Sequence, residues 1–316
     1  MLLPTAKTLV LMPYYEDTRA CQLLLQALRA QLGPDCFVLF VDDCSPQQPL
    51  TASALADAGL PGRILRLRRN AGHQQALALG LQYLAPHLQP QQQLVLMDSD
   101  GEDAPEAIPG LLAQLSQSAG AIDAVVAARG RRRERWTFVA CYRAYQLLFR
   151  LSTGRVLDFG NFMVLSASGA QALAARPSLP VHMAASLLAS DLRLGRHTVD
   201  RAQRYAGVSK MNLSALVGHG LRAIRVFKTR VLQRLRHAAL LLAGLAAVLA
   251  WLSTGQSGSG MALFGFWGCS ALALLCVLLY GLLAWKLASS YPQPDMAMVA
   301  ATIDVPAPAA GQRRPE

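Results

Sequence analysis

The sequence lacks the cysteine spacings of a disulfide framework or a zinc site. Its six cysteines include no C-x-x-C pair, so we expect reduced, mostly buried thiols, as in a cytoplasmic protein. The opening residues, Met1-Leu2-Leu3-Pro4, have neither the basic start nor the long apolar core of a signal peptide. No G-x-G-x-x-G follows the first predicted strand, where the chain has Pro13-Tyr14-Tyr15. This argues against a dinucleotide-dependent oxidoreductase.

Charge is also scarce, at 16% of the 316 residues, and it is unevenly placed. The formal net charge is +11, with arginines gathered between residues 129 and 155 and again between 193 and 236. Such a balance fits nucleic acid, an anionic membrane surface or a phosphate-bearing substrate. Because the arginines adjoin long apolar segments, anionic lipid explains them better than nucleic acid, which we do not expect as a partner.

Short apolar runs alternate with helical patterns over the first 130 residues. The runs predicted as strands are Lys7–Met12, Cys36–Val41, Arg63–Leu67, Leu94–Met97 and Asp123–Ala128. The helical patterns are Thr18–Gln31, Ala71–Leu84 and Pro105–Ser116. Strands that are apolar throughout and alternate with helices predict an α/β fold with a mainly parallel sheet covered on both faces. Ligands bind at the carboxyl ends of such strands.

The most informative stretch is Leu94–Asp103, where an apolar strand runs into three acidic residues. Alternate side chains of an extended segment share a face, so Asp98, Asp100 and Glu102 should project together. Three hard oxygen ligands at this spacing suit Mg²⁺ or Mn²⁺. A polar turn, with Asp103 capping the helix that begins near Pro105, explains the same residues equally well. Two further polar motifs, Asp42-Asp43 and Asn70-Ala71-Gly72, also follow strands, and this convergence favours a site.

The rest of the chain points to a membrane. Trp136–Leu151 is predicted as an amphipathic helix, either packed on the core or in contact with substrate or membrane. Leu213–Arg236 is a second amphipathic and basic stretch. It leads into the apolar segments Ala238–Leu252 and Met261–Trp285, which we expect to span a membrane as a hairpin. The basic residues before the first span and Lys286 after the second place both ends on the cytoplasmic side.

The motifs of this chain, taken in order, resemble those of family 2 glycosyltransferases of the GT-A fold. Three of them are Met12–Asp17, Val41–Pro46 and Arg69–Gly72, and the fourth is Met97–Glu106. The segment from Arg204 to Lys210 is similar to the R-x-x-G-x-S-K element of the polyprenyl-phosphate branch, which includes dolichol-phosphate mannose synthases and relatives with two C-terminal membrane helices. The resemblance implies a GT-A domain over residues 1–210. From the sequence pattern we expect basic interface helices over 211–236, a transmembrane hairpin over 237–286 and a disordered tail over 287–316.

The resemblance also implies roles for individual residues. The acidic pair Asp98 and Asp100 would hold Mg²⁺ or Mn²⁺, with Glu102 as a further oxygen ligand. Asp43 would hold its turn. The residues that would bind the nucleotide-sugar are Pro13, Tyr15, Asp17, Asp42, Asp98, Ser99, Asp100 and Arg129. Those that would contact the acceptor phosphate are Arg143, Arg204, Ser209 and Lys210. The catalytic group would be Asp98, Asp100, Arg129, Arg204 and Lys210. We interpret His73 and His182 as structural.

These features predict a membrane-anchored, metal-dependent, inverting glycosyltransferase that moves a sugar from a nucleotide to polyprenyl phosphate. The implied setting is the bacterial inner membrane and cell-envelope glycan synthesis, with a multi-pass chain and a cytoplasmic catalytic domain. A divalent cation and arginines would stabilise the departing nucleotide. Since a lipid phosphate is already anionic near neutral pH, no strong general base is needed. Assembly of several copies is left open, as are another lipid or glycan acceptor and a non-catalytic nucleotide-binding protein.

Two departures from the family pattern bear on the acceptor. Relatives usually carry an arginine-containing motif after the glycine of Asp158–Val164, where this chain has Met163 and Val164. Val208 replaces a common acidic residue before Ser209 and Lys210. The Q-x-x-R-W motif of processive synthases is not found.

Overall fold

The computed structural model divides the chain into two compact units. The residues that it describes are 6–130, 136–200, 202–206, 213–255, 260–287, 291 and 293–307. The first unit comprises Met1–Arg135, Leu157–His219 and Tyr291–Glu316, and the second comprises Trp136–Val156 and Gly220–Ser290. The observed division differs from the expected domain boundary at residue 210. Residues 136–156 are grouped with the C-terminal helices, whereas residues 211–219 and 291–316 belong to the first unit.

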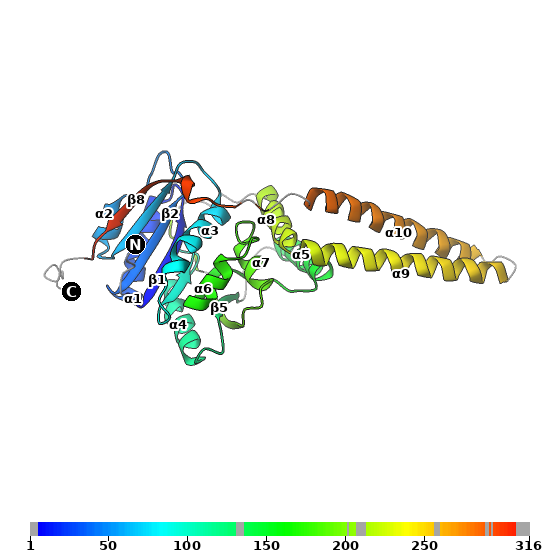
Figure 1. Ribbon diagram of the computed structural model, residues 1–316, viewed down its shortest axis with the longest axis horizontal. Coiled ribbons are helices and arrows are strands. Elements are labelled where there is room, and N and C mark those ends of the chain that lie inside the picture. Colours follow the sequence, from blue (N-terminus) through cyan, green and yellow to red (C-terminus); the bar gives the residue numbers. More distant parts are fainter. Residues whose placement is uncertain are drawn as a thin grey trace. The chain divides into compact units, whose positions relative to one another are not determined.

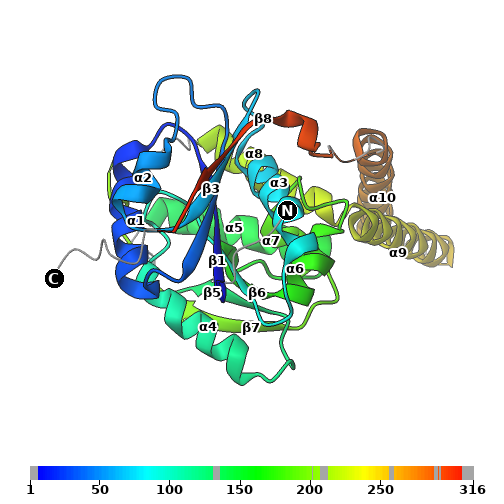
Figure 2. The same ribbon diagram turned by 60° about the vertical axis from the view of Figure 1, so that its left-hand side comes forward.

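The first unit is built on a mixed sheet with eight described strands (Figure 1 and Figure 2). They lie in the order β7-β5-β6-β4-β1-β2-β3-β8. Their bounds are β1 Thr8–Tyr14, β2 Cys36–Asp42, β3 Gly62–Leu67, β4 Gln93–Leu96, β5 Ala124–Arg129, β6 Phe159–Ser166, β7 Leu194–Val199 and β8 Val299–Val305. All five predicted strands are present. Strands β6, β7 and β8 were not predicted.

Most strands of this sheet run in the same direction. Parallel pairing joins β1 to β2 and β4, β2 to β3, and β5 to β7. Strand β6 is antiparallel to both β4 and β5, and β8 is antiparallel to β3. The mainly parallel α/β sheet is thus confirmed, and the carboxyl ends of its parallel strands meet at one edge.

Helices cover both faces of the sheet (Figure 2). One face packs against α1 (Thr18–Leu32), α2 (Ala52–Asp57) and α4 (Ile108–Gln117), and its core includes Val10 and Met12 of β1. The other carries α3 (His73–Leu84) and α6 (Ala167–Ala174), with α7 (Met183–Leu188) following along the chain. The alternation of strand side chains explains both layers, because Val10 and Met12 point to one face while Leu9 and Leu11 point to the other.

A glycine sets how closely α3 approaches the sheet. A Cβ atom on Gly80 would lie 2.4 Å from Leu11 Cδ1 and 2.9 Å from Val41 Cγ2. Only a residue without a side chain fits here, so α3 lies tightly on β1 and β2. The N-terminus of α3 is thereby held beside the ends of those strands.

The segment expected to be a disordered tail instead contains an edge strand. Strand β8 pairs with β3, and the Asp304 carboxylate forms an ion pair with Arg63. Ile303 packs against the core and Val305 is buried in it. The prediction of disorder was wrong over this strand because alternating β-branched residues can complete a sheet edge even beside proline-rich sequence.

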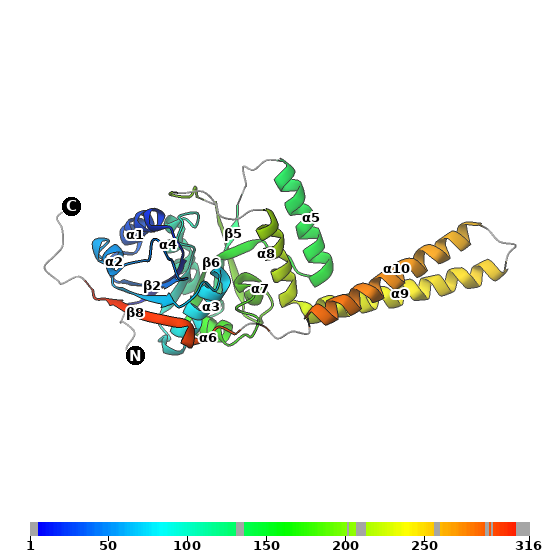
Figure 3. The ribbon, with the colours of Figure 1, turned by 90° about the horizontal axis from the view of Figure 1, so that it is seen from above.

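The second unit is helical. Its elements are α5 (Trp136–Thr153), the part of α8 (Leu213–Val226) from Gly220 onward, α9 (Lys228–Gly255) and α10 (Gly260–Leu287). Helices α9 and α10 lie side by side as a hairpin (Figure 3). Within them, Lys228–Trp251 and Phe266–Trp285 are long and apolar enough to cross a membrane, and few of their residues are buried in the protein. Apolar helices that expose their side chains all round are typical of lipid contact.

Candidate active site

The polar motifs converge at the carboxyl edge of the sheet, as predicted. Strands β1, β2 and β4 end at Tyr14, Asp42 and Leu96, in neighbouring positions of the sheet. The antiparallel strand β6 begins at the same edge, because Phe159 pairs with Ala128 near the end of β5. The loops after β1, β2 and β4 are therefore the candidate site.

The acidic loop after β4 is braced by its own side chains. The Asp98 amide donates to Asp103 Oδ2 at 2.9 Å, and the Glu102 amide donates to Asp100 Oδ1 at 2.9 Å. Ser99 is buried. Asp103 thus holds this turn, and the 35% exposed Asp98 side chain lies at the edge of the sheet.

A second segment lies along this acidic loop. The amide of Ala202 donates to the Glu102 carbonyl, and the amide of Tyr205 donates to the Asp100 carbonyl, each at 3.1 Å. The Tyr205 ring lies over Gly101, where a Cβ atom would be 2.4 Å from Tyr205 Cδ2. Gly101 also has φ +85°, so both the backbone turn and the close ring contact require glycine. Residues far apart in the sequence thereby form one wall of the site.

Arg204 lies among three carboxylates in this wall. Its Nη1 is 3.1 Å from Asp17 Oδ2, its Nη2 is 2.5 Å from Asp100 Oδ2, and its Nε is 3.7 Å from Glu102 Oε1. Arg204 and its partners are about one-fifth exposed. Charge-assisted contacts at this depth are stronger than those on an open surface. The structure thus brings Asp17, Asp100, Glu102 and Arg204 together at the carboxyl edge of the sheet.

The predicted metal ligands only partly match this geometry. Among the residues described by the structure, no group of three or more His, Cys, Asp or Glu side chains is spaced to hold a metal ion. In place of a three-carboxylate site, Arg204 contacts both Asp100 and Glu102. The hard oxygens of Asp98 and Asp100 still fit Mg²⁺ or Mn²⁺, which take only one or two carboxylates when substrate phosphates and waters complete their ligands.

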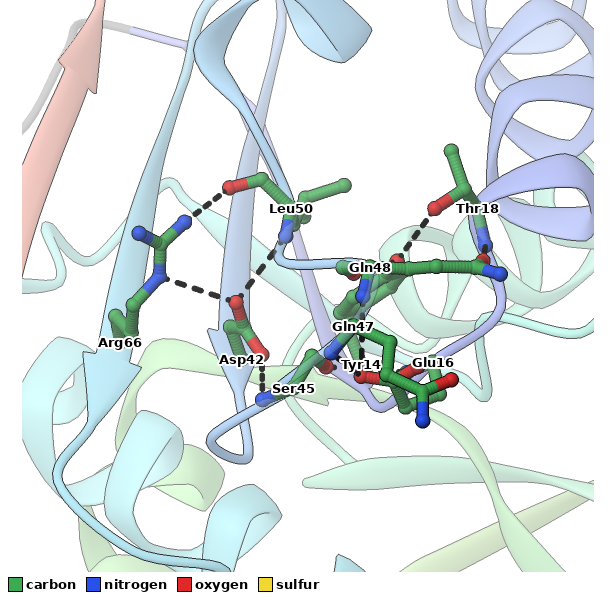
Figure 4. Close-up of polar contacts among 9 residues, drawn as sticks. All are labelled: Tyr14, Glu16, Thr18, Asp42, Ser45, Gln47, Gln48, Leu50 and Arg66. Carbon is green, nitrogen blue, oxygen red and sulfur yellow. Dashed lines mark hydrogen bonds and ion pairs between the residues drawn. The ribbon is translucent and has the colours of Figure 1, made fainter.

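The loop after β2 is held from beneath by Asp42 (Figure 4). This carboxylate is fully buried. Its Oδ1 accepts from the Ser45 amide at 3.0 Å, while its Oδ2 accepts from the Leu50 amide at 3.1 Å and from Arg66 Nε at 3.2 Å. Arg66 also donates to the Leu50 carbonyl. Asp42 was expected to contact the nucleotide base, but here both of its oxygens are bound within the protein and support the loop.

The loop after β1 also holds residues 45–50, which we call the cradle (Figure 4). Glu16 Oε1 accepts from the amides of Gln47 and Gln48 at 2.8 and 3.1 Å. The Tyr14 hydroxyl donates to the Gln48 carbonyl at 2.6 Å. Pro13 is buried in β1, whereas the Tyr15 side chain is 40% exposed. Of the residues predicted for the nucleotide at this place, Tyr15 is the one that presents a ring to solvent.

Asp43 holds the turn that precedes α3, as expected. Its Oδ1 and Oδ2 accept from the amides of Ala71 and Gly72 at 2.6 and 2.8 Å. Burial raises the pKa of Asp43 above its usual value, although these two amides act in the opposite direction. The Asn70-Ala71-Gly72 motif is thereby fixed beside the acidic loop.

His73 and Asn161 are site residues that sequence reasoning missed. His73 Nε2 is 3.3 Å from Asp98 Oδ1, and Asn161 Nδ2 is 2.9 Å from His73 Nε2. Although the surrounding protein atoms favour the neutral ring, the Asp98, Asp103 and Asp100 carboxylates raise the pKa of His73. His73 was interpreted as structural. However, it directly follows the Asn70-Ala71-Gly72 motif, and this position in the sequence indicates that it lies near the site. Asn161 lies on the unpredicted strand β6, so no local pattern placed it here.

Other predicted site residues are not part of this described cluster. Arg129 ends β5, and its side chain lies outside the described atoms, as do residues Ser209 and Lys210. Arg143 is exposed on α5 and belongs to the second compact unit. His182 is buried and caps α7, where its Nδ1 accepts from the Ala185 amide at 3.3 Å. That contact gives His182 the structural role expected of it.

Comparison with known proteins agrees with the fold and the motifs. Residues 9–170 match the model of glycosyl transferase family 2. The chain is 30% identical, over 162 residues, to the undecaprenyl-phosphate 4-deoxy-4-formamido-L-arabinose transferase of Enterobacter sp. (strain 638), covering 49% of this chain and 46% of that protein. The chain thus spans about half the length of that curated relative.

Solved structures with the same fold include glucosyl-3-phosphoglycerate synthase from Mycobacterium tuberculosis. Its complex with phosphoglyceric acid and its complex with Mn²⁺ and uridine-diphosphate-glucose each give a TM-score of 0.51 at 18% identity. The matches cover 72% of this chain and 80% and 79% of those chains. At this identity the likeness shows the fold, which is the expected GT-A fold. With the family model covering just over half of its length, the chain belongs to glycosyltransferase family 2.

Proposed function

We propose that this protein transfers a sugar from a nucleotide-sugar to a polyprenyl phosphate at the cytoplasmic face of a bacterial inner membrane. The observation that carries the proposal is the cluster of Asp98, Asp100 and Arg204 at the carboxyl edge of a family 2 domain. A sugar diphosphate needs cationic groups at its phosphates and carboxylates that can hold a divalent cation. This edge of the sheet supplies both.

In this proposal, the donor lies along the loops after β1, β2 and β4. The cradle of residues 45–50, held by Asp42 and Glu16, receives the base and ribose with Tyr15 and Asp17 beside it. Ser99 and Arg129 contact the diphosphate. Asp98 and Asp100 hold Mg²⁺ or Mn²⁺, and Glu102 is the further oxygen donor. The ion, when bound, neutralises charge that develops on the departing nucleotide.

The acceptor is itself the nucleophile. A phosphate oxygen of the lipid attacks the anomeric carbon, a new carbon–oxygen bond forms, and the bond to the nucleotide diphosphate breaks with inversion. The electron pair of the broken bond leaves on the diphosphate oxygen, where Arg129 and Arg204 stabilise it. Arg143, Ser209 and Lys210 are assigned to the lipid phosphate. Because the attacking oxygen is already anionic, no proton has to be removed in this step.

Two observations support a lipid acceptor. By its name, the Enterobacter relative transfers its sugar to undecaprenyl phosphate. The second unit contains two helices that are long and apolar enough to cross a membrane. Arginines before the first of these helices favour cytoplasmic placement of the adjoining residues. A cytoplasmic nucleotide-sugar and a membrane-bound phosphate would then meet at the same surface.

The test is transfer of labelled sugar from a panel of nucleotide-sugars to undecaprenyl phosphate, with Mn²⁺ or Mg²⁺ present. We expect metal-dependent label in the organic phase from at least one donor, and its loss with EDTA. Asp100→Asn should lower transfer at least about a hundredfold, because it removes a carboxylate that would hold the metal ion at the diphosphate. Asp57→Asn is the matched control, since Asp57 is an exposed carboxylate on α2.

The outcomes separate the alternatives. Label that stays in the aqueous phase on a soluble acceptor would overturn the polyprenyl assignment but not glycosyl transfer. Nucleotide binding without transfer to any acceptor would favour the non-catalytic alternative. Normal transfer by Asp100→Asn would contradict the assignment of this carboxylate to the metal.

A further inference from the structure

The second unit carries a large positive charge with no acidic residue to balance it. Its two segments, residues 136–156 and 220–290, contain ten lysines and arginines and no aspartate or glutamate. These cations therefore cannot form ion pairs with side chains of their own unit. Charges gathered in this way beside apolar helices attract the phosphates of anionic lipids.

Part of this charge is built into a cleft between the end of α5 and the first turns of α9. The cleft has a volume of about 440 Å³ and is lined by Thr153, Gly154, Arg230, Gln233, Arg234 and His237. Arg230, Arg234 and His237 are spaced i, i+4 and i+7, so they share one face of α9. All three are exposed.

The wall formed by α5 is fixed by specific contacts. The Gly154 amide donates to the Arg150 carbonyl at 2.8 Å, and the Thr153 hydroxyl donates to the Phe149 carbonyl at 2.7 Å. The Phe149 ring meets that of Phe227 edge to face, with centroids 5.6 Å apart. Since Phe227 directly precedes α9, this contact sets the position of α5 against the cleft.

Arg234 lines the cleft and lies close against Gly154. Its Nη1 donates to the Leu151 carbonyl at 3.1 Å, at the C-terminal end of α5, where a cation is favoured. A Cβ atom on Gly154 would lie 2.4 Å from Arg234 Nη2, and the φ of Gly154 is +72°. Glycine here lets the guanidinium lie against the backbone. Because the bond to Leu151 uses only one of its five N–H groups, Arg234 keeps donors for an anion.

The surroundings favour a lipid over a free phosphate. Beyond His237, α9 continues without a charged residue and exposes Leu240, Leu241 and Leu245. On α5, Leu147, Leu148 and Leu151 are each more than half exposed. A second hollow of about 340 Å³ shares Gln233 with the first and reaches Tyr280 and Ala284 of α10. Cations followed directly by exposed apolar surface match a phosphate headgroup followed by acyl chains.

We propose that this cleft binds the phosphate headgroup of an anionic glycerophospholipid, with Arg230 and Arg234 as its principal donors. The site would anchor α5 and α9 at the level of the headgroups, and it shares no residue with the catalytic cluster around Arg204. The inference rests on the membrane insertion of α9 and α10 that the proposed function includes, but not on the identity of the acceptor.

The experiment is native mass spectrometry of the full chain released from detergent. Its probes are phosphatidylglycerol, phosphatidylcholine, undecaprenyl phosphate and inorganic phosphate. We expect phosphatidylglycerol to be retained over phosphatidylcholine. Arg230→Gln should weaken its binding about fivefold, and Arg230→Gln with Arg234→Gln about thirtyfold, because each cation near a membrane surface contributes on the order of a factor of five. Arg222→Gln, which removes an exposed charge outside the cleft, should leave phosphatidylglycerol binding unchanged.

Three results would overturn the proposal. They are equal retention of phosphatidylglycerol by Arg230→Gln and Arg222→Gln, displacement of phosphatidylglycerol by millimolar inorganic phosphate, and selective retention of undecaprenyl phosphate alone. Arg234 also donates a hydrogen bond to the end of α5, and the double variant loses this bond. The single Arg230→Gln variant keeps the bond, so it tests the headgroup site without disturbing α5. Sugar transfer is measured in parallel. Transfer with no phosphatidylglycerol preference would refute only the headgroup site, whereas headgroup selectivity without transfer would refute only the proposed function.

Discussion

Replacing Arg204 should separate metal affinity from turnover. Its guanidinium contacts Asp100 and Glu102, two of the residues assigned to the metal. A cation and a divalent ion compete for the same carboxylates, so the ion must displace at least the contact between Arg204 and Asp100. In the Arg204→Gln variant that competition is removed. We therefore expect Mn²⁺ to bind more tightly to this variant than to the wild-type chain when no donor is present.

The size of the effect follows from the contacts. A hydrogen bond to a charged group contributes about 1.5–3 kcal/mol. Because Arg204 is about one-fifth exposed, we take the lower end for the bond to Asp100 Oδ2. About 1.5 kcal/mol corresponds to roughly tenfold tighter Mn²⁺ binding. Sugar transfer should fall at the same time, since the residue that would stabilise the leaving diphosphate is lost.

Isothermal titration of Mn²⁺ into nucleotide-free protein measures the first effect, and the labelled-sugar assay measures the second. Arg193→Gln is the matched control. Arg193 forms an ion pair with Asp123 at 2.8 Å, away from the strand ends that form the site. If Arg204→Gln binds Mn²⁺ no more tightly than the control does, Arg204 does not compete with the metal, and the reasoning fails.

Two further predictions concern the first unit. Ending the chain after Pro294 removes β8 and the ion pair between Asp304 and Arg63. The melting temperature should fall, and aggregation should rise because the edge of β3 becomes exposed. An unchanged melting temperature by calorimetry would contradict this role of β8. Burial raises the pKa of Cys36 to about 11, so about 0.1% of it is thiolate at pH 8, and iodoacetamide should modify the partly exposed Cys44 first. Peptide mapping that finds Cys36 labelled as fast as Cys44 would refute that difference.

Local patterns were sufficient to predict the centre of the sheet. Each of β1 to β5 is a short apolar run bounded by turn residues, and the site motifs follow three of these runs directly. Since parallel strands bring their carboxyl ends to one edge, the convergence of Asp42 and Asp98 on that edge follows from the parallel direction of β2 and β4 alone. The acidic residues after β4 then indicated a site for a divalent cation.

Long-range pairing is what the sequence did not predict. Strand β8 pairs with β3 across more than 230 residues, so nothing near Val299 indicated a strand partner. The contacts of Arg204 with Asp17 and of His73 with Asn161 likewise join segments whose proximity depends on the completed sheet. Helix α5 gave an ambiguous pattern because it has both kinds of surface: Phe149 is buried against Phe227, while Leu147, Leu148 and Leu151 are exposed.

The position of β8 in the chain adds an argument about the membrane that does not use charge. Helices α9 and α10 come between α8 and β8, and β8 is part of the same sheet as the acidic loop. Both ends of the hairpin are therefore joined to one folded unit, which cannot lie on both sides of a bilayer. If α9 crosses the membrane, α10 must cross back. By the positive-inside rule, the basic residues before α9 and Lys286 after the second span favour the cytoplasmic side for those ends. Chain topology thus places both ends of the hairpin on one side of the membrane, and charge alone favours the cytoplasmic side that the proposed function requires.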